Sequence, residues 1–236
     1  MSNFSSYNYL KRNKVWDKLT SHDIVINIKE TYPQKVLDMC YKDDSYKEDK
    51  IIQYLEDNSY CILGIHCSRL TKYEINDIKR NGLRYGNKET LINKIKNLPQ
   101  EVPYDIKIKL LKHINSLKSS VFNNNICCSC GYLDFSNDSG CNKIFTDNWG
   151  GEVIYNYYNH NGIETDKEKY IAKILNSISY PCIIFTRARI TQSSTKYLRF
   201  SDLVRKGTEN TFDTLTGHLI IDNEKVEVID IIKIDE

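Results

Sequence analysis

Three sets of residues in this sequence bring together side chains that could do chemistry. The first is a group of four cysteines, Cys127, Cys128, Cys130 and Cys141. The spacing Cys127-x-x-Cys130 is that of a zinc knuckle, and Cys141 could supply a third ligand. A complete structural zinc site needs a second well-spaced pair, and the sequence has none. We therefore favour buried strand cysteines over a metal site.

The second set would support nucleophilic catalysis by a thiol and an imidazole, with Cys67 or Cys182 beside His66 or His218. Cys67 follows His66 directly, and successive residues of a strand point to opposite faces of its sheet. The two side chains are therefore poor partners. We give this chemistry the least weight of the three.

The third set is a ligand site formed by His66, Ser68, Tyr132 and Glu152. Residues 61–65 are an apolar run that is short enough for a buried strand. We expect this strand to end where it delivers His66. A histidine at the end of a buried strand, directly before a capped helix, forms a corner that suits ligand binding.

A helix with clear end signals is expected to follow this strand. Thr71 is a good N-cap, and Glu74, three residues later, completes a capping box. Ile75 and Ile78 lie about one turn apart and form an inward stripe. Gly82 ends the helix, as a left-handed residue after the last turn does.

A second distinctive segment is the run Trp149-Gly150-Gly151-Glu152, which continues to Tyr155. Two adjacent glycines beside a tryptophan and a glutamate are costly in a regular helix or strand. We interpret them as a close approach of the backbone to a ligand or to another segment.

On these motifs the sequence resembles the ADP-ribosyltransferase fold, in particular the His-Tyr-Glu branch that includes poly-ADP-ribose polymerases and DarT-like DNA-modifying toxins. In that branch a strand ends in His-Gly-Ser/Thr or His-x-Thr, and a helix runs to an Ile-x-x-x-Gly-Leu stop. Here His66-Cys67-Ser68 leads to Ile78 and Gly82, with Cys67 replacing the usual glycine. The sequence is also similar to bacterial proteins with a His-Cys-Thr/Ser-Arg-Leu start and a later Trp-Gly-Gly-Glu-Ala/Val-Ile-Tyr. The resemblance covers roughly residues 60–235.

This resemblance implies a site for NAD, which would be consumed as a substrate. The histidine and the backbone near the serine would hold the ribose and the nicotinamide amide, and an aromatic ring would stack on the nicotinamide. An arginine would pair with the pyrophosphate through two hydrogen bonds. The residues implied to bind NAD are His66, Cys67, Ser68, Arg69, Arg84 and Tyr132.

The resemblance also implies a catalytic glutamate. That carboxylate would bond the ribose hydroxyl, stabilise the oxocarbenium-like state as nicotinamide leaves, and orient or deprotonate the incoming nucleophile. The family usually places it at the start of a late strand. We favour the earlier Glu152, because the neighbouring glycines give a backbone reason for close ligand approach. With His66 and Tyr132 it completes the predicted catalytic set; the alternatives, which lack a convincing motif, are Glu209, Glu224 and Glu227.

The elements that must position these residues alternate along the chain. Residues 1–58 contain short helical patterns and form an N-terminal helical extension, whereas residues 59–236 form the ADP-ribosyltransferase-like domain. Helices are predicted over residues 88–120, interrupted by two prolines, and over residues 166–178. A central strand is predicted over residues 181–187.

The end of the chain predicts two strands around a turn at Asp222-Asn223. Strands interrupted by helices, with hairpin strands at the end, are typical of an α+β fold. The resemblance implies that the core is a split mixed or antiparallel sheet with flanking helices.

The composition says more about the cellular compartment of the protein than about its binding partner. The 236-residue chain carries 33 Lys and Arg against 31 Asp and Glu, so bulk charge predicts no partner. No run approaches the ~18 apolar residues of a membrane span, and residues 1–20 lack an apolar core with a cleavage site. We expect a cytoplasmic protein with reduced cysteines and no membrane partner.

The resemblance therefore favours an NAD-dependent mono-ADP-ribosyltransferase, a toxin-like effector of bacterial conflict or phage defence with an antitoxin or chaperone partner. Basic residues favour a single-stranded nucleic-acid acceptor, RNA before DNA, although a solvated helix face explains the lysines more simply. These residues are Lys94, Lys96, Lys107, Lys109, Lys112, Lys118, Arg187, Arg189, Arg199 and Arg205. The alternatives are a protein acceptor, an NAD-dependent RNA 2′-phosphotransferase, and a non-catalytic binding module on the same fold.

Overall fold

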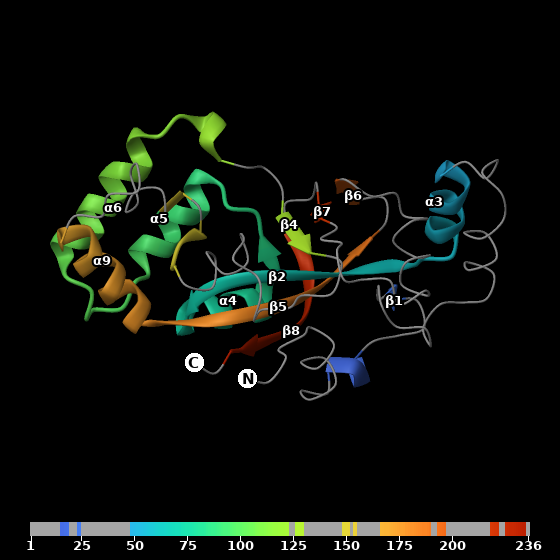
Figure 1. Cartoon of the computed structure of the whole chain (residues 1–236), viewed down its shortest axis with the longest axis horizontal. Helices are drawn as coiled ribbons and strands as arrows, with labels where there is room; N and C mark the ends of the chain where they lie inside the picture. The colour runs from blue at the N-terminus through green and yellow to red at the C-terminus, as the bar shows by residue number, and fades with distance from the viewer. Residues whose placement is uncertain are drawn as a thin grey trace.

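A computed structural model describes residues 15–18, 23–24, 48–122, 126–129, 148–151, 153–154, 166–189, 193–196, 218–221 and 225–234. These residues form an α+β fold, as the sequence predicts, with a strongly curled sheet and helices packed beside it (Figure 1). None of the helices in these ranges has both the length and the apolar character that crossing a bilayer requires.

The element bounds agree with most of the predicted ones. The α-helices are α3 (Glu48–Asp57), α4 (Lys72–Asn81), α5 (Lys88–Lys96), α6 (Tyr104–Ser116) and α9 (Asp166–Ser177), with 3-10 helices η1 (Val15–Lys18) and η2 (Ser119–Val121). The strands are β1 (Asp23–Ile24), β2 (Cys61–Thr71), β3 (Leu83–Arg84), β4 (Ile126–Ser129), β5 (Ser179–Arg189), β6 (Ser193–Lys196), β7 (His218–Ile221) and β8 (Lys225–Lys233).

Two long antiparallel strands, β2 and β5, form the centre of the sheet. They pair along their whole length, from Cys61 opposite Arg189 to Thr71 opposite Ser179. The strand order is β3-β8-β5-β2-β4-β7-β6, and β1 pairs in parallel with the start of β2. The described sheet is thus mixed but mainly antiparallel.

The predicted C-terminal hairpin is wrong. β7 and β8 occupy the expected residues, but β7 pairs with β4 and β6, while β8 pairs with β5 and β3. Three strands separate the two in the sheet order. A turn signal shows where one strand stops, but the partner of each strand is chosen by packing with residues far away in the sequence.

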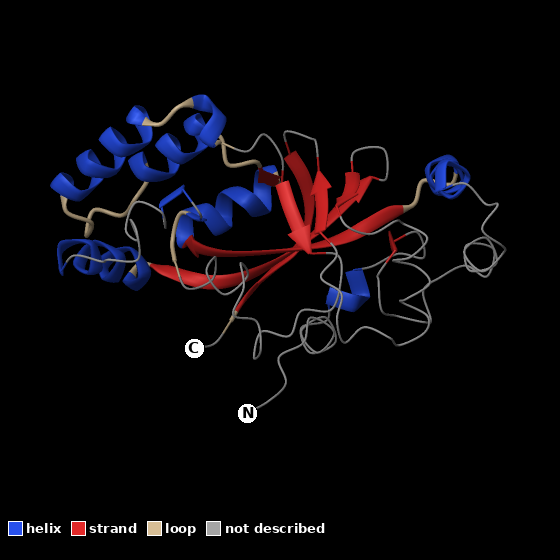
Figure 2. Ribbon diagram, turned by 45° about the horizontal axis from the view of Figure 1, so that its top comes forward, coloured by secondary structure: helices blue, strands red, loops and turns tan. Residues whose placement is uncertain are grey.

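Two apolar clusters hold the helices against the sheet. One joins α4 to the central strands through Ile62, Leu70, Ile75 and Ile78. The other lies among α5, α6 and α9, which gather at one end of the sheet, opposite the end where α3 lies (Figure 2). Trp149 is 1% exposed and belongs to this helical cluster. Its position links the helical layer to the sheet.

The signals predicted for α4 are confirmed, except for the conformation of Gly82. The Thr71 hydroxyl accepts a hydrogen bond from the Glu74 N–H, and the Glu74 carboxylate accepts one from the Thr71 N–H at 2.9 Å. Gly82 ends the helix with a positive φ of 82°, but its ψ of 168° is not that of the left-handed helical residue that the sequence predicts. A Cβ there would stand 2.6 Å from the Val226 carbonyl oxygen. A glycine is therefore required where the chain leaves α4 for β3.

Candidate functional site

His66 lies in the middle of β2, not at its end as the sequence analysis predicts. The strand continues five residues further, to Thr71, because β5 supplies a hydrogen-bonding partner along all of it. His66 pairs across the strands with Ile184 and is half-buried. The histidine thus has a rigid strand on both sides rather than a loop after it.

His66 and Ser68 project to one face of β2, and Cys67 projects to the other, because side chains alternate along a strand. Ser68 pairs with Cys182 of β5, and Cys67, 3% exposed, pairs with Ile183. The predicted ligand pair His66 and Ser68 therefore shares one surface. Only the backbone of Cys67 is suited to contact a ligand on that surface.

Arg69 is engaged by the junction between α9 and β5. Its Nε donates to the Ser179 hydroxyl at 3.1 Å, and its Nη2 donates to the Asn176 carbonyl at 2.9 Å and the Ser179 carbonyl at 3.3 Å. These contacts fix the guanidinium within the protein. Arg84, the other arginine predicted to bind pyrophosphate, lies exposed on β3.

The segment that begins at Trp149 lies beside β2. Trp149 forms a parallel bridge with Arg69, three residues after His66. Its backbone N–H donates to the Asn176 side-chain oxygen at 3.4 Å, and its indole N–H donates to Glu74 at 2.8 Å. Two motifs about eighty positions apart in the sequence are therefore neighbours in the fold.

Glu74 is a residue whose wider role the sequence reasoning missed. Its side chain is 5% exposed, and its Oε2 accepts from the Thr71 hydroxyl at 2.9 Å and from the Trp149 indole. The Lys94 ammonium of α5 lies 3.1 Å from its Oε1. The capping-box spacing predicts the contact with Thr71, but no local signal identifies the tryptophan or the lysine.

The two glycines after Trp149 are explained by backbone shape and packing. Gly150 has φ 90° and Gly151 has φ 67°, a region that disfavours L side chains. A Cβ on Gly150 would overlap the Ile154 side chain, whereas a Cβ on Gly151 would meet nothing within 4 Å. The crowding at Gly150 comes from Ile154, four residues later in the same segment, and not from the ligand or other segment that the sequence predicts.

Several predicted residues lie outside the described part of the chain. They are Tyr132, Glu152, Arg199, Arg205, Glu209, Glu224, Cys130 and Cys141. Of the alternative glutamates, Glu227 is described: its carboxylate accepts from Arg187 Nη1 at 2.7 Å and is 60% exposed. This ion pair lies on β5 and β8, at their surface.

The described thiols are poorly suited to nucleophilic chemistry. Burial raises the pKa of the Cys182 thiol from 9.0 to about 12, so the thiol stays protonated at neutral pH. Cys128 is 1% exposed, and its sulfur lies 3.7 Å from the Thr186 hydroxyl. Within the described residues, no group of three or more His, Cys, Asp or Glu side chains is arranged to hold a metal ion.

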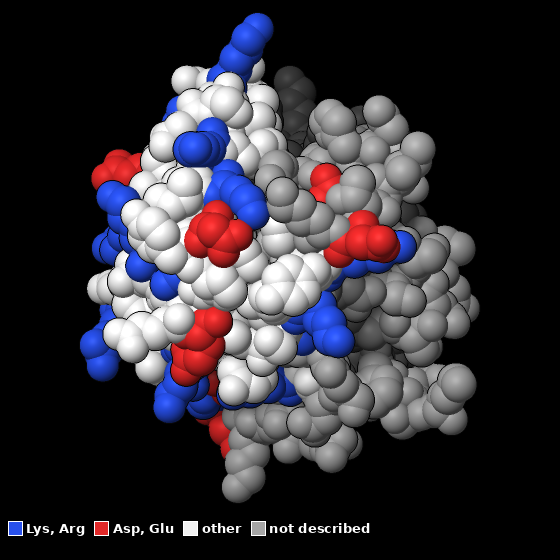
Figure 3. Space-filling model, turned by 90° about the vertical axis from the view of Figure 1, so that its left-hand side faces the viewer, with Lys and Arg blue, Asp and Glu red and all other residues white. Residues whose placement is uncertain are grey.

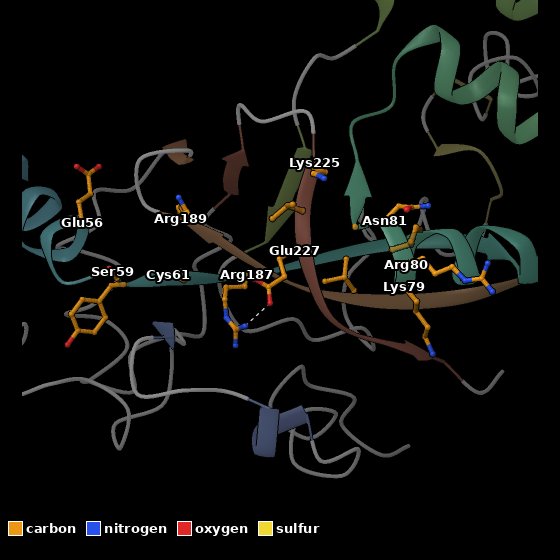
Figure 4. A pocket seen from close by; sticks show the side chains of 15 residues that line it. Glu56, Ser59, Cys61, Lys79, Arg80, Asn81, Arg187, Arg189, Lys225 and Glu227 are labelled. Carbon is orange, nitrogen blue, oxygen red and sulfur yellow. Dashed lines mark hydrogen bonds and ion pairs between the residues drawn. The ribbon is translucent and has the colours of Figure 1, made fainter.

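A cavity of about 970 Å³ opens on another part of the sheet. It is bounded by the α3–β2 connection, the end of α4, the end of β5 and the start of β8 (Figure 4). Its polar lining residues include Lys79, Arg80, Arg187, Arg189 and Lys225. His66 and Ser68 are not among its lining residues, although Cys61 of the same strand is.

Three of the six lysines that the sequence predicts to track a phosphate backbone bind the protein itself. Lys109 pairs with Asp105 at 2.8 Å, Lys107 donates to the Leu98 carbonyl, and Lys94 pairs with Glu74. On the face shown in Figure 3, basic and acidic side chains are interspersed rather than gathered by sign. This arrangement fits a solvated helix face, the simpler explanation of these lysines.

Comparisons with known proteins give no further assignment: no protein-family model, curated protein or solved structure matches this chain. The α+β fold and the geometry around β2 are therefore the basis for a functional proposal.

Proposed function

We propose that this protein is an NAD-dependent mono-ADP-ribosyltransferase whose nicotinamide-ribose site lies on the β2 face that carries His66 and Ser68. The observation that supports this most directly is the bridge between Arg69 and Trp149. It brings the His-Cys-Ser-Arg-Leu motif and the Trp-Gly-Gly-Glu motif side by side. The first motif belongs to the pattern that resembles the ADP-ribosyltransferase fold, and the two motifs together are similar to the group of bacterial proteins that carries both.

The proposed reaction breaks the bond between the nicotinamide nitrogen and the ribose C1′ of NAD. Nicotinamide leaves with the bonding electrons, and positive charge develops on the ribose. Glu152 stabilises that charge and hydrogen-bonds the ribose hydroxyl. The acceptor then attacks C1′ and loses its proton, for which the same carboxylate serves as base. The products are the ADP-ribosylated acceptor, nicotinamide and a proton.

Each NAD-binding residue has a separate proposed role. His66 and Ser68, which share one face of β2, hold the ribose and the nicotinamide amide, and Cys67 contributes its backbone. Tyr132 stacks on the nicotinamide. Because the Arg69 guanidinium is already bound to Ser179 and Asn176, the exposed Arg84 is the better partner for the pyrophosphate.

We further propose that the acceptor is a single-stranded nucleic acid, RNA in preference to DNA. A toxin-like effector of bacterial conflict or phage defence with this activity would need a neutralising antitoxin or chaperone. The competing functions are transfer to a protein, removal of an RNA 2′-phosphate, and binding without catalysis. Transfer to RNA predicts that radiolabel from the ADP-ribose part of NAD becomes attached to the RNA.

The decisive experiment measures nicotinamide release and label transfer by the purified chain. His66→Ala and Glu152→Ala are expected to lose activity by roughly a hundredfold or more, because each removes a contact made at the reacting ribose. Glu209→Ala and Glu227→Ala serve as matched controls and keep activity. A wild-type chain that neither binds nor consumes NAD would sink the proposal. If Glu152→Ala stays active and one of the control variants loses activity, the catalytic glutamate is the residue replaced in that control.

A further inference from the structure

Among the described residues, the lining of the cavity of about 970 Å³ beside the end of α4 has an excess of positive charge. These residues supply five basic side chains, Lys79, Arg80, Arg187, Arg189 and Lys225, and two acidic ones, Glu56 and Glu227. Glu227 is already paired with Arg187 at 2.7 Å, and the same guanidinium donates to the Lys18 carbonyl at 3.2 Å. The acidic side chains therefore balance only part of the basic ones.

Three of these basic residues come from two elements, α4 and β8, and are exposed. Lys79 and Arg80 belong to the last turn of α4, and Lys225 begins β8. Within the described residues, none of the three forms an ion pair with a carboxylate. Figure 4 shows them along the cavity side that α4 and β8 form, while Arg187 and Arg189 approach from β5.

Helix stability accounts for only part of this arrangement. Lys79 and Arg80 are favourable near the negative end of the α4 dipole. The same explanation does not apply to Lys225, which lies on a strand, and like charges around one hollow repel each other. In contrast, Lys94, Lys107 and Lys109 of the helical layer are bound by the protein's own oxygens. Lys79, Arg80 and Lys225 are therefore the basic residues available to bind an external anion.

We infer that this cavity binds the phosphate groups of the nucleic-acid acceptor, an assignment that rests on the proposed transferase function. A positively charged groove that follows the backbone is the usual way to bind a single strand. His66 does not line the cavity, but Cys61, five residues earlier on β2, does. Five strand residues span roughly 17 Å, and this odd spacing puts the Cys61 and His66 side chains on opposite faces of β2. A single strand held in the cavity would therefore have to pass round the sheet to reach the proposed reaction site.

The pyrophosphate of NAD offers the same phosphate chemistry. We favour the acceptor because the residues that would hold the nicotinamide ribose, His66 and Ser68, lie outside the cavity lining. The cavity is also open and several times larger than one pyrophosphate needs. The two sources of phosphate are separated by measuring RNA binding and NAD binding independently.

The test uses the full chain and a fluorescein-labelled oligouridylate of about 12 nucleotides, within the usual site sizes for single strands. Anisotropy is measured without NAD, at salt concentrations from about 50 to 200 mM. The cavity variant is Lys79→Gln, Arg80→Gln and Lys225→Gln combined. The control variant is Lys72→Gln, Lys169→Gln and Lys173→Gln combined, which removes the same charge from exposed positions on α4 and α9.

The cavity variant is expected to lose RNA affinity by roughly tenfold or more. The slope of log affinity against log salt should become less steep by about 2, because three phosphate contacts contribute about 0.7 each. The control variant should change affinity by less than about twofold. Equal weakening in both variants overturns the inference, as does unchanged affinity in the cavity variant. If the cavity variant binds NAD more weakly but binds RNA as the wild type does, the cavity holds the pyrophosphate of NAD, and the inference is again overturned.

Failure of this inference is distinct from failure of the proposed function. A chain that binds RNA through the cavity but releases no nicotinamide from NAD disproves the transferase and keeps the RNA site. If the chain releases nicotinamide normally but replacing Lys79, Arg80 and Lys225 leaves its RNA affinity unchanged, the proposed transferase activity stands and the RNA site in the cavity is disproved.

Discussion

The indole N–H of Trp149 donates a hydrogen bond to the carboxylate of Glu74 at 2.8 Å. Both residues are buried, with 1% and 4% of their whole-residue surface exposed. The bond connects the segment after residue 148 to the first turn of α4. Because Lys94 of α5 approaches the other oxygen of the same carboxylate, one side chain joins the sheet, α4 and the helical layer.

Replacing Glu74 should therefore destabilise the protein more than replacing an ordinary helix cap. Glu74→Ala leaves the Trp149 indole N–H and the Thr71 N–H without their acceptor and removes the partner of Lys94. We expect the free energy of unfolding to fall by about 2–4 kcal/mol. Urea denaturation followed by tryptophan fluorescence measures this change.

Two further variants show whether the contacts or the charge are responsible. Glu74→Gln keeps an acceptor for the indole but loses the attraction to Lys94, so it should cost less than Glu74→Ala. Glu89→Gln, at an exposed position on α5, should change stability by less than about 0.5 kcal/mol. If Glu74→Ala unfolds at the wild-type urea concentration, the buried network has no stabilising role.

The features predicted correctly from the sequence are those with local causes. The capping box of Thr71 and Glu74 and the stop at Gly82 depend on residues within one or two turns of each other. The prolines at positions 99 and 103 likewise lie in the connection between α5 and α6. Such signals act over a few residues, so a single sequence contains them completely.

The features that were missed have causes far away in the chain. Arg69 binds Ser179, 110 positions away, and Glu74 binds Trp149, 75 positions away. The end of β2 was placed too early because its continuation past His66 depends on β5. The turn signal before β8 gave no information about which strands β7 and β8 would join. Such choices are made by packing across the whole sheet.

Gly64 should not tolerate a side chain, because two neighbouring strands fill the space beside it. A Cβ there would stand 2.6 Å from the Thr186 hydroxyl oxygen and 3.0 Å from the Cys128 Cβ. The hydroxyl cannot move away freely, since it donates to the Gly64 carbonyl at 3.0 Å. Gly64→Ala should therefore lower the free energy of unfolding by about 1–3 kcal/mol.

Gly86→Ala is the matched control for Gly64→Ala, because a Cβ on Gly86 would have nothing within 4 Å. It should leave stability unchanged or slightly raised, as it restricts the unfolded chain. Thermal unfolding of both variants provides the comparison. Equal melting temperatures for the two would show that the β2, β4 and β5 strands are not packed as tightly as described.

Arg69 and Arg84 should respond differently to replacement. Arg69→Lys keeps the charge but cannot reproduce the forked contacts with Ser179 and Asn176. It should lower the free energy of unfolding by about 1–3 kcal/mol. Arg84→Gln changes an exposed residue of β3, so it should leave stability within about 0.5 kcal/mol.

Under the proposed function, the same two variants also separate structure from NAD binding. Arg84→Gln should raise KM for NAD roughly tenfold or more, since one charge-assisted contact to the pyrophosphate is lost. Urea denaturation and nicotinamide-release kinetics on one preparation give both quantities. If Arg69→Lys is stable but has a raised KM for NAD, and Arg84→Gln has an unchanged KM, then Arg69 and not Arg84 binds the pyrophosphate.

Cys182 should be chemically inert in the folded protein. Burial raises the pKa of its thiol from 9.0 to about 12, and the Sγ–H donates to the Tyr180 carbonyl at 3.3 Å. The folded state therefore holds this proton more tightly than the unfolded chain. The resulting stabilisation is fully present below about pH 9 and is lost as the pH rises toward about 12.

Alkylation by iodoacetamide at about pH 8, followed by peptide mass spectrometry, tests this directly, because the thiolate is the species that reacts. Cys182 should react roughly a hundredfold or more slowly in the folded protein than in urea. Cys61, half-buried at the start of β2, is the internal comparison and should be less protected. Folded-state alkylation of Cys182 as fast as in urea would mean an accessible, ionised thiol beside Ser68. Nucleophilic catalysis by that thiol would then compete with NAD chemistry on the same face of the sheet.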